Sequence, residues 1–168
     1  MPACAVSSIR QANKEELVML FDNLTPKEKE KVHKTGIKRK FKDGDFVIRE
    51  KDSGDSLFFV LSGEVEIRKK LDADRSKCLQ TLGESKFFGE MSFFDKAARS
   101  ADVVACGNCE LLEIPSEEFE KLMISNPAVG AKIYKNIGME LTEKLRSNND
   151  ELKKAILWAV EGWKYPAT

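Results

Sequence analysis

Between residues 37 and 114, a glycine followed by an acidic residue recurs, mostly at intervals of about ten residues. Glycine adopts backbone conformations that other residues avoid, so such pairs are typical of tight turns between short strands. The pairs are Gly44-Asp45, Gly54-Asp55, Gly63-Glu64, Gly83-Glu84 and Gly89-Glu90. This pattern predicts a chain of mainly β with α structure, built around an antiparallel β-roll that is double-stranded and jelly-roll-like.

Apolar runs between the turns indicate the individual strands. Leu57–Leu61 and Val65–Arg68 flank Ser62-Gly63-Glu64, and they are predicted to form a hairpin with a glycine-bearing turn. Further strands are predicted at Cys78–Leu82, Ala101–Ala105 and Glu110–Ile114. These segments supply the strands of the roll.

Helices are predicted on both sides of the roll. Lys14–Asp22 carries apolar residues among charges, which suits a short amphipathic helix. Thr25-Pro26-Lys27-Glu28 forms a capping box that begins a second helix, and Gly36 ends it. A short helix is predicted after Pro115 and Ser116, running to about Ser125, and Asn126-Pro127 begins a long one. The predicted organisation is an N-terminal helical segment (1–36), the roll (37–125) and a long C-terminal helix (126–168).

Length and charge exclude several classes of protein. A chain of 168 residues holds one ordinary domain with helical flanks. Lys plus Arg and Asp plus Glu each total 28, and the net charge of zero argues against a chain built to coat nucleic acid or an anionic membrane. No apolar run approaches the roughly 18 residues of a membrane span, and the N-terminus lacks the features of a signal peptide. We therefore expect a soluble cytoplasmic protein.

The reactive side chains do not favour a metal, redox or catalytic function. Cys106 and Cys109 have Cys-x-x-Cys spacing, but the sequence has no second such pair and its only histidine is His33. His33 lies in a lysine-rich helix end, where a solvated side chain or a charge at the helix C-terminus is favoured over a catalytic group. No combination of nucleophile, base and orienting group stands out. We expect no enzyme activity, no metal and no cofactor.

The stretch Phe87–Ala101, called the cassette below, carries the chemistry of the sequence. Gly89 lets backbone approach a ligand closely, and the amides that begin the following short helix can point at an anion. Arg99 adds a fork of charged donors that fits the oxygens of a phosphate. Glu90 is an acceptor suited to a sugar hydroxyl. Together these residues predict a site for a sugar phosphate.

The cassette resembles the phosphate-binding cassette of the cyclic nucleotide-binding domain family, as in the effector domain of catabolite activator proteins. Family members share its Phe-Gly-Glu opening and its Arg-(Ala/Ser)-Ala close, and the resemblance covers roughly residues 37–125, including Asp52–Val65. It implies that Arg99 pairs with the cyclic phosphate and that Glu90 holds the ribose 2'-hydroxyl. The implied ligand-binding residues are Gly89, Glu90, Met91, Ser92, Arg99, Ser100 and Ala101.

Asp102 departs from the family pattern, since many relatives carry Thr or Ser there and a carboxylate would repel a phosphate. Strand alternation can turn Asp102 away from the ligand, which would affect base preference more than binding.

The resemblance implies a non-enzymatic sensor of a cyclic purine nucleotide, cAMP in preference to cGMP. One alternative is a ligand-free roll that serves as a scaffold or dimerisation module, which Asp102 would favour. Another is the effector part of a transcription regulator that acts with a separate partner.

The predicted C-terminal helix carries an apolar stripe. Its members alternate by four and three residues, the pattern of a two-helix coil with an asparagine at a core position. They are Leu141, Leu145, Asn148, Leu152, Ala155 and Ala159. The spacing predicts a parallel homodimer, and the alternative is that the stripe packs on the roll of its own chain.

Arg146 and Asn148 are the candidate base contacts. Beyond Gly162 no room remains for the DNA-binding domain of related transcription factors, so we expect no direct contact with nucleic acid and none with a membrane.

Overall fold

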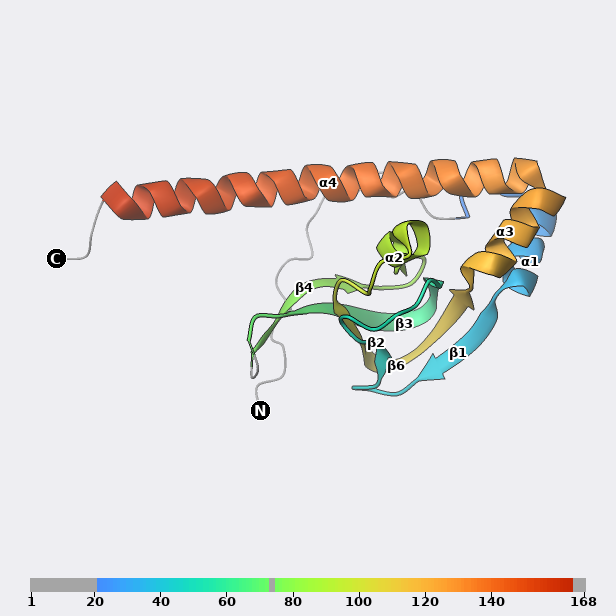
Figure 1. Cartoon of the computed structure of the whole chain (residues 1–168), viewed down its shortest axis with the longest axis horizontal. Helices are drawn as coiled ribbons and strands as arrows, with labels where there is room; N and C mark the ends of the chain where they lie inside the picture. The colour runs from blue at the N-terminus through green and yellow to red at the C-terminus, as the bar shows by residue number, and fades with distance from the viewer. Residues whose placement is uncertain (1–20, 73–74, 165–168) are drawn as a thin grey trace. The chain divides into compact units, whose positions relative to one another are not determined.

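The computed structural model describes residues 21–72 and 75–164, whose elements are shown in Figure 1. The chain divides into two compact units, Met19–Gly138 and a second that combines Met1–Val18 with Met139–Thr168. The first unit contains the roll and the first turns of the long helix, and the second contains the remainder of that helix. The helix predicted over Lys14–Asp22 lies outside the described residues except for Phe21 and Asp22, which belong to a turn.

Helix α1 (Pro26–Thr35) has the predicted start and end. The Glu28 N–H donates to the Thr25 hydroxyl (3.3 Å), and the Thr25 N–H donates to the Glu28 carboxylate (2.7 Å). Lys132 also donates to this carboxylate at 2.9 Å. The hydrogen bond from Lys132, followed by that from the Thr25 N–H, lowers the pKa of Glu28 to about 2. The capping box is therefore confirmed, and it also ties α1 to the start of the long helix.

Antiparallel strands form the six-stranded sheet of the roll. They are β1 (Ile37–Phe41), β2 (Phe46–Ile48), β3 (Leu57–Lys70), β4 (Ser76–Leu82), β5 (Phe87–Phe88) and β6 (Asp102–Ile114). Their order is β1-β6-β3-β4, with β2 paired to β6 and β5 paired to β3. The core inside the roll is built from Ile48, Phe58, Val60, Val65, Leu82, Phe88, Val103, Ala105, Cys109 and Leu111. The predicted antiparallel roll is confirmed as an open sheet with helices.

The predicted hairpin around Gly63 is wrong, because β3 runs without interruption through this residue. In its pairing with β6, Ser62 faces Glu110 and Glu64 faces Cys106, so residues 107–109 of β6 lie opposite Gly63 alone. An added Cβ on Gly63 would lie 2.5 Å from the Asn108 carbonyl oxygen, and the φ of Gly63 is 80°. Glycine is required here by the close approach of the partner strand, not by a turn between two strands.

The two strands predicted at Ala101–Ala105 and Glu110–Ile114 are likewise one continuous strand, β6. Gly107, with a φ of 75°, lies in the bulge opposite Gly63. Because β3 pairs with β6 on both sides of this bulge, the ladder resumes and the strand does not end. The strand predicted at Cys78–Leu82 is confirmed within β4.

Three helices complete the described structure: α2 (Glu90–Asp95), α3 (Ser116–Ser125) and α4 (Pro127–Lys164). Helix α3 ends at the predicted residue and begins at Ser116, one residue earlier than predicted. In the first turns of α4, Val129, Ile133 and Ile137 are buried within the first unit. Phe119 of α3 lies edge-on to Tyr134 of α4, with ring centroids 5.5 Å apart. The beginning of α4 is therefore part of the same packed body as the roll.

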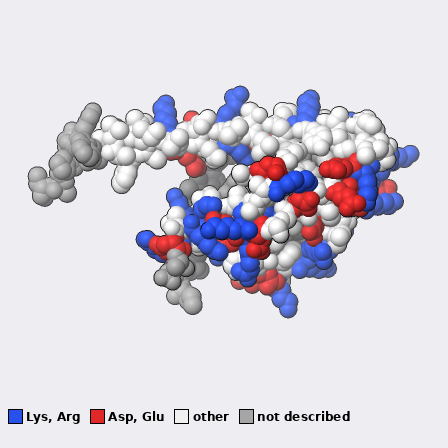
Figure 2. Space-filling model, in the orientation of Figure 1, with Lys and Arg blue, Asp and Glu red and all other residues white. Residues whose placement is uncertain are grey.

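Residues 139–164 of α4, in the second unit, expose large apolar side chains, which include Leu145, Leu152 and Trp158. Within the described ranges, no helix is both long and apolar enough to cross a membrane. Figure 2 shows acidic and basic side chains interspersed over the roll. The mixture agrees with the equal totals of 28 basic and 28 acidic residues.

Candidate anion-binding site

The turn between β5 and α2 brings backbone close to Arg99. Gly89 forms the N-cap of α2 with a φ of 84°, a left-handed conformation that disfavours residues with a side chain. An added Cβ on Gly89 would lie 2.9 Å from Arg99 Nη1 and 2.9 Å from the Ser56 carbonyl oxygen. Glycine at this position thus allows the guanidinium and the backbone of α2 to meet.

Arg99 is a buried cation of the cassette, with only 7% of its surface exposed. Its Nη1 donates to the carbonyl oxygens of Ser56 (3.0 Å) and Gly89 (3.2 Å). An added Cβ on Gly54 would lie 3.1 Å from Nη2 and 3.2 Å from Nε, so this glycine keeps space beside the other donors. The guanidinium carbon also lies 5.7 Å from the centre of the Phe58 ring. The side chain is therefore held by backbone and an aromatic ring.

The electrostatic surroundings of Arg99 suit an anionic ligand. Burial lowers the pKa of the guanidinium, and the carboxylates of Asp55 and Glu113 oppose that shift. Both carboxylates have cations of their own, since Asp55 pairs with Lys96 at 3.3 Å and Glu113 with Arg39 at 2.9 Å. A buried cation whose hydrogen bonds go to carbonyl oxygens gains strongly from an incoming counter-charge.

The other predicted cassette residues differ in exposure. Glu90 is half-buried in the first turn of α2, close in sequence to the Gly89 turn. Ser92 and Ala101 are buried, whereas Met91 and Ser100 are exposed. The fold thus brings the Gly89 turn and Arg99 together, and it places Met91 on the outer side of α2.

Asp102 is buried, but its charge is compensated by groups outside the cassette. Its Oδ1 accepts a hydrogen bond from the Glu50 N–H at 2.7 Å, and its Oδ2 lies 3.6 Å from Lys70 Nζ. The cassette motif contains neither of these partners, so sequence reasoning missed them. A basic run at Arg68–Lys70, at the end of a predicted strand, was the available signal.

Sequence reasoning also missed the backbone that supports Arg99. The Arg99 N–H donates to the Asp52 carbonyl (2.9 Å), and the Lys51 N–H donates to the Arg99 carbonyl (2.8 Å). Both residues follow β2, and Asp52 is the first residue of the glycine-containing stretch that resembles the family's roll. Their position in that stretch could have indicated proximity to the cassette, but their hydrogen-bond partners are not apparent from spacing.

Arg146 and Asn148, the predicted base contacts, lie in the second unit and are exposed there. Gly89 and Arg99 belong to the first unit. The role of Arg146 and Asn148 at a base therefore stays a prediction.

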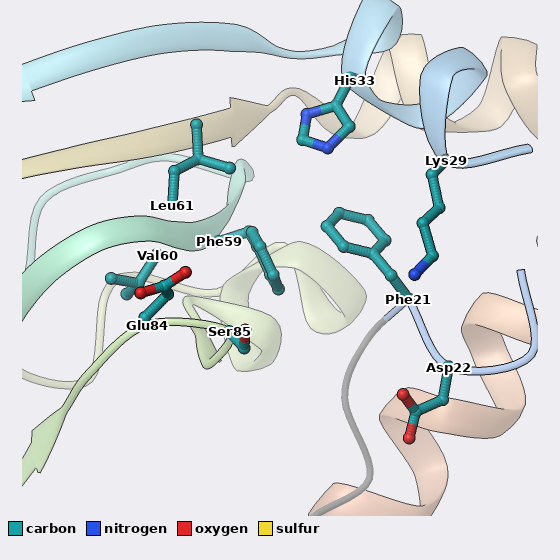
Figure 3. Close-up of a pocket in the computed structure, with 9 residues that line it drawn as sticks. All are labelled: Phe21, Asp22, Lys29, His33, Phe59, Val60, Leu61, Glu84 and Ser85. Atoms are coloured by element: carbon teal, nitrogen blue, oxygen red, sulfur yellow. The ribbon is translucent and has the colours of Figure 1, made fainter. Parts of the chain in front are cut away.

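A separate hollow of about 200 Å³ lies in the first unit and contains none of the cassette residues. Figure 3 shows His33 and Lys29 of α1 on one side of it and Phe59 and Val60 of β3 on another, with Phe21 between them. The rings of Phe21 and His33 are 5.3 Å apart. Burial, followed by the charges of Lys38 and Lys29, lowers the pKa of His33. His33 is thus half-buried and its neutral form is favoured, which corrects the prediction of a solvated charge.

The two cysteines of the Cys-x-x-Cys segment lie on β6 as free thiols, Cys106 exposed and Cys109 buried. Burial is the main cause that raises the pKa of both thiols, so neither is activated as a thiolate. Among residues 21–72 and 75–164, no group of three or more His, Cys, Asp or Glu side chains could hold a metal ion.

The roll, the glycine turn and the buried arginine define a module for binding a small anionic ligand. The chain belongs to the cyclic nucleotide-binding domain family, which matches residues 38–126. This membership confirms the family that the cassette predicts.

The relatives include a cyclic AMP receptor protein and the regulatory subunit of a protein kinase. The cyclic AMP receptor protein of Thermus thermophilus is 31% identical over 133 residues, which cover 79% of this chain and 60% of that protein. The cAMP-dependent protein kinase regulatory subunit of Dictyostelium discoideum is 28% identical over 120 residues, or 70% of this chain and 33% of that subunit. The crystal structure of Thermus thermophilus catabolite activator protein has a TM-score of 0.72 at 29% identity, covering 81% of this chain and 62% of that one. This chain therefore spans between 33% and 62% of the length of these relatives.

Proposed function

We propose that this protein is a non-enzymatic sensor that binds a cyclic purine nucleotide, cAMP in preference to cGMP, in the roll beside Arg99. The observation that carries the proposal is the buried guanidinium of Arg99, which donates to two backbone carbonyls next to the Gly89 turn. A cyclic phosphate would supply the counter-charge that burial makes favourable. No bond of the ligand is broken in this function.

The remaining cassette residues have distinct roles in the proposal. Glu90 accepts a hydrogen bond from the ribose 2'-hydroxyl, since an ionised carboxylate is acceptor-only. The backbone N–H groups at Gly89, Ser100 and Ala101 donate to the phosphate, while Met91 and Ser92 shape the turn around it. Arg146 and Asn148 of α4 contact the base. The preference for cAMP is supported by the names of the receptor protein and kinase subunit among the relatives.

Binding would be transmitted through the aromatic packing around α2. Phe93 of α2 lies 5.3 Å from Phe119 of α3, and Phe94 lies 5.9 Å from Tyr134 in the first turns of α4. A ligand that moves α2 thus acts directly on α3 and on the start of α4. In the proposed sensor these helices shift, and residues 139–164 of α4 form a parallel homodimer whose geometry reports occupancy.

The alternative of a ligand-free roll has lost the support that Asp102 offered. The carboxylate of Asp102 accepts a hydrogen bond from the Glu50 N–H and lies near Lys70, so it is not an uncompensated negative charge at the cassette. We therefore give priority to the ligand-binding function.

Calorimetric titration of the whole chain with cAMP, cGMP and 5'-AMP tests the proposal. We expect binding of the cyclic nucleotides, tightest for cAMP, and a loss of about 3–5 kcal/mol in Arg99→Ala because the phosphate would lose its buried partner. Arg49→Ala is the matched control, since Arg49 is exposed on the same unit and its guanidinium rests on the Phe46 ring. Equal cAMP affinity in wild type and Arg99→Ala would contradict the assignment, whereas Arg49→Ala should bind as wild type does.

A further inference from the structure

A network of charged side chains from outside the cassette contacts the segment Arg99–Asp102. Lys69 Nζ, at the end of β3, donates to the Ser100 carbonyl at 2.6 Å and to Glu50 Oε1 at 2.9 Å. The other carboxylate oxygen of Glu50 accepts from the Lys70 N–H at 3.3 Å. The network therefore connects Glu50 and the end of β3 to Ser100, near the end of the cassette.

The backbone of Glu50 extends the network to Asp102. Its N–H donates to Asp102 Oδ1 at 2.7 Å, and Asp102 Oδ2 lies 3.6 Å from Lys70 Nζ. Asp102 is only 4% exposed, so these partners offset the cost of burying its charge. The hydrogen bond from Lys69 is the main cause that lowers the pKa of Glu50, which keeps this carboxylate ionised beside the lysine.

The hydrogen bonds to their carbonyl oxygens determine the orientation of two successive peptide groups, Arg99–Ser100 and Ser100–Ala101. In a trans peptide the carbonyl and the following N–H point in opposite directions. The Arg99 carbonyl accepts from the Lys51 N–H, so the Ser100 N–H points away from residue 51. The Ser100 carbonyl accepts from Lys69 Nζ, so the Ala101 N–H points away from Lys69. A cation on the carbonyl also polarises the peptide and strengthens its N–H as a donor.

We propose that Lys69 is a positioning residue that orients and polarises the Ser100–Ala101 peptide, so that the Ala101 N–H donates to the phosphate of the ligand. The inference rests on the proposed function, because it names a residue outside the cassette that prepares the same site. Lys69 acts through the Ser100 carbonyl and not by contact with the ligand. Glu50 accepts a hydrogen bond from the same Lys69 Nζ and so holds the lysine in place.

Lys69→Met tests the proposal, with Lys77→Met as the matched control. Lys77 lies opposite Lys69 on β4 and is exposed, so its replacement removes the same charge from the same part of the sheet. We expect Lys69→Met to weaken cAMP binding about tenfold, the value of one charge-assisted hydrogen bond. Lys69→Arg should recover most of the affinity because a guanidinium can donate to both the carbonyl and the carboxylate. Lys77→Met should bind as wild type does.

The chemical shift of the Ala101 amide in the free protein reports on this peptide and does not depend on the overall stability of the fold. An NMR spectrum should show this signal displaced in Lys69→Met, returned towards its original position in Lys69→Arg and unchanged in Lys77→Met. If Lys69→Met does not fold by circular dichroism, Lys69→Gln takes its place. An unchanged Ala101 signal, or equal affinity losses in the Lys69→Met and Lys77→Met variants, overturns the positioning role. Wild-type protein that binds no cyclic nucleotide instead overturns the proposed function, and the Ala101 signal still decides whether Lys69 orients this peptide.

Discussion

Helix α4 has two parts that differ in their exposure to solvent. Ile133 and Ile137, in the part that belongs to the unit of the roll, are 0% and 1% exposed, whereas Leu145 and Leu152, in the second unit, are 63% and 59% exposed. Burial of apolar surface contributes about 25 cal/mol per Å², so the first part stabilises the roll, whereas the second leaves large apolar side chains exposed. One continuous helix therefore contains both a packed segment and a segment with an exposed apolar stripe.

The difference also bears on the proposed dimer. The regular spacing of Leu145 and Leu152 with Asn148 is not needed to stabilise the roll, whose core consists of other residues. An exposed apolar stripe of this kind is typical of an interface with a partner helix. In the proposed homodimer, these residues form the interface between the two helices.

The largest expected effect separates the two parts of α4 by their contribution to folding. Ile133→Ala should lower the free energy of unfolding by about 2–5 kcal/mol, because it removes buried methyl groups and leaves a cavity. Ile156→Ala removes the same atoms at a position that is 53% exposed, and its effect should be below about 0.5 kcal/mol. Urea unfolding followed by circular dichroism measures both. Equal losses in the two variants would contradict the distinction between the parts.

A second prediction changes association without changing the roll. Leu145→Asp combined with Leu152→Asp should place like charges opposite one another in a dimer and yield monomers at micromolar concentration. Sedimentation velocity measures the mass, and calorimetry should still detect nucleotide binding.

Asn148→Leu should strengthen association and loosen its specificity, since a buried Asn at a core position costs stability but specifies register.

Ser147→Asp combined with Lys154→Asp is the control for this pair. Both residues are exposed and lie off the predicted stripe, so the variant adds two carboxylates without changing the seam. Sedimentation of the wild type as a monomer, with and without nucleotide, would remove the dimer mechanism. That outcome would favour the alternative, in which the stripe packs on the roll of its own chain.

The smallest expected effect is a pH dependence confined to the unit of the roll. The folded-state pKa of His33 is below its ordinary value of 6.5, chiefly because of burial. As the pH falls through 6.5, the unfolded chain takes up this proton first, so stability is lost between neutral pH and the folded-state pKa. His33→Gln should flatten this part of the curve, measured as the difference between urea midpoints at pH 7.5 and pH 5.5. Identical curves for wild type and variant would show that His33 titrates alike in both states.

Features that depend on neighbours in sequence were predictable. The capping box needs only Thr25 and Glu28, which lie within one helical turn, and α3 has equally local start and end signals. Gly89 and Arg99 of the cassette are close enough along the chain to be identified together. Their contact in the structure agrees with the chemistry that the sequence indicates.

Features that depend on distant partners were not predictable. Gly63 is a usual turn residue by local criteria, but its place in a continuous strand depends on residues 107–109 of β6. The surroundings of Asp102 likewise depend on Glu50 and Lys70, neither of which its own segment reveals. A lysine-rich helix end indicates a solvated His33, and only the packing of Phe21 against it shows otherwise.

The sequence by itself determined the class of the fold, both ends of α1 and the family to which the cassette belongs, because turn glycines, caps and a compact phosphate motif act over a few residues. Tertiary structure alone decided that β3 and β6 are long bulged strands, that Arg99 donates to the Ser56 carbonyl, and that Lys69 reaches Ser100. Strand register and burial are set by segments far apart in the chain, so their energetic consequences appear only once those segments meet.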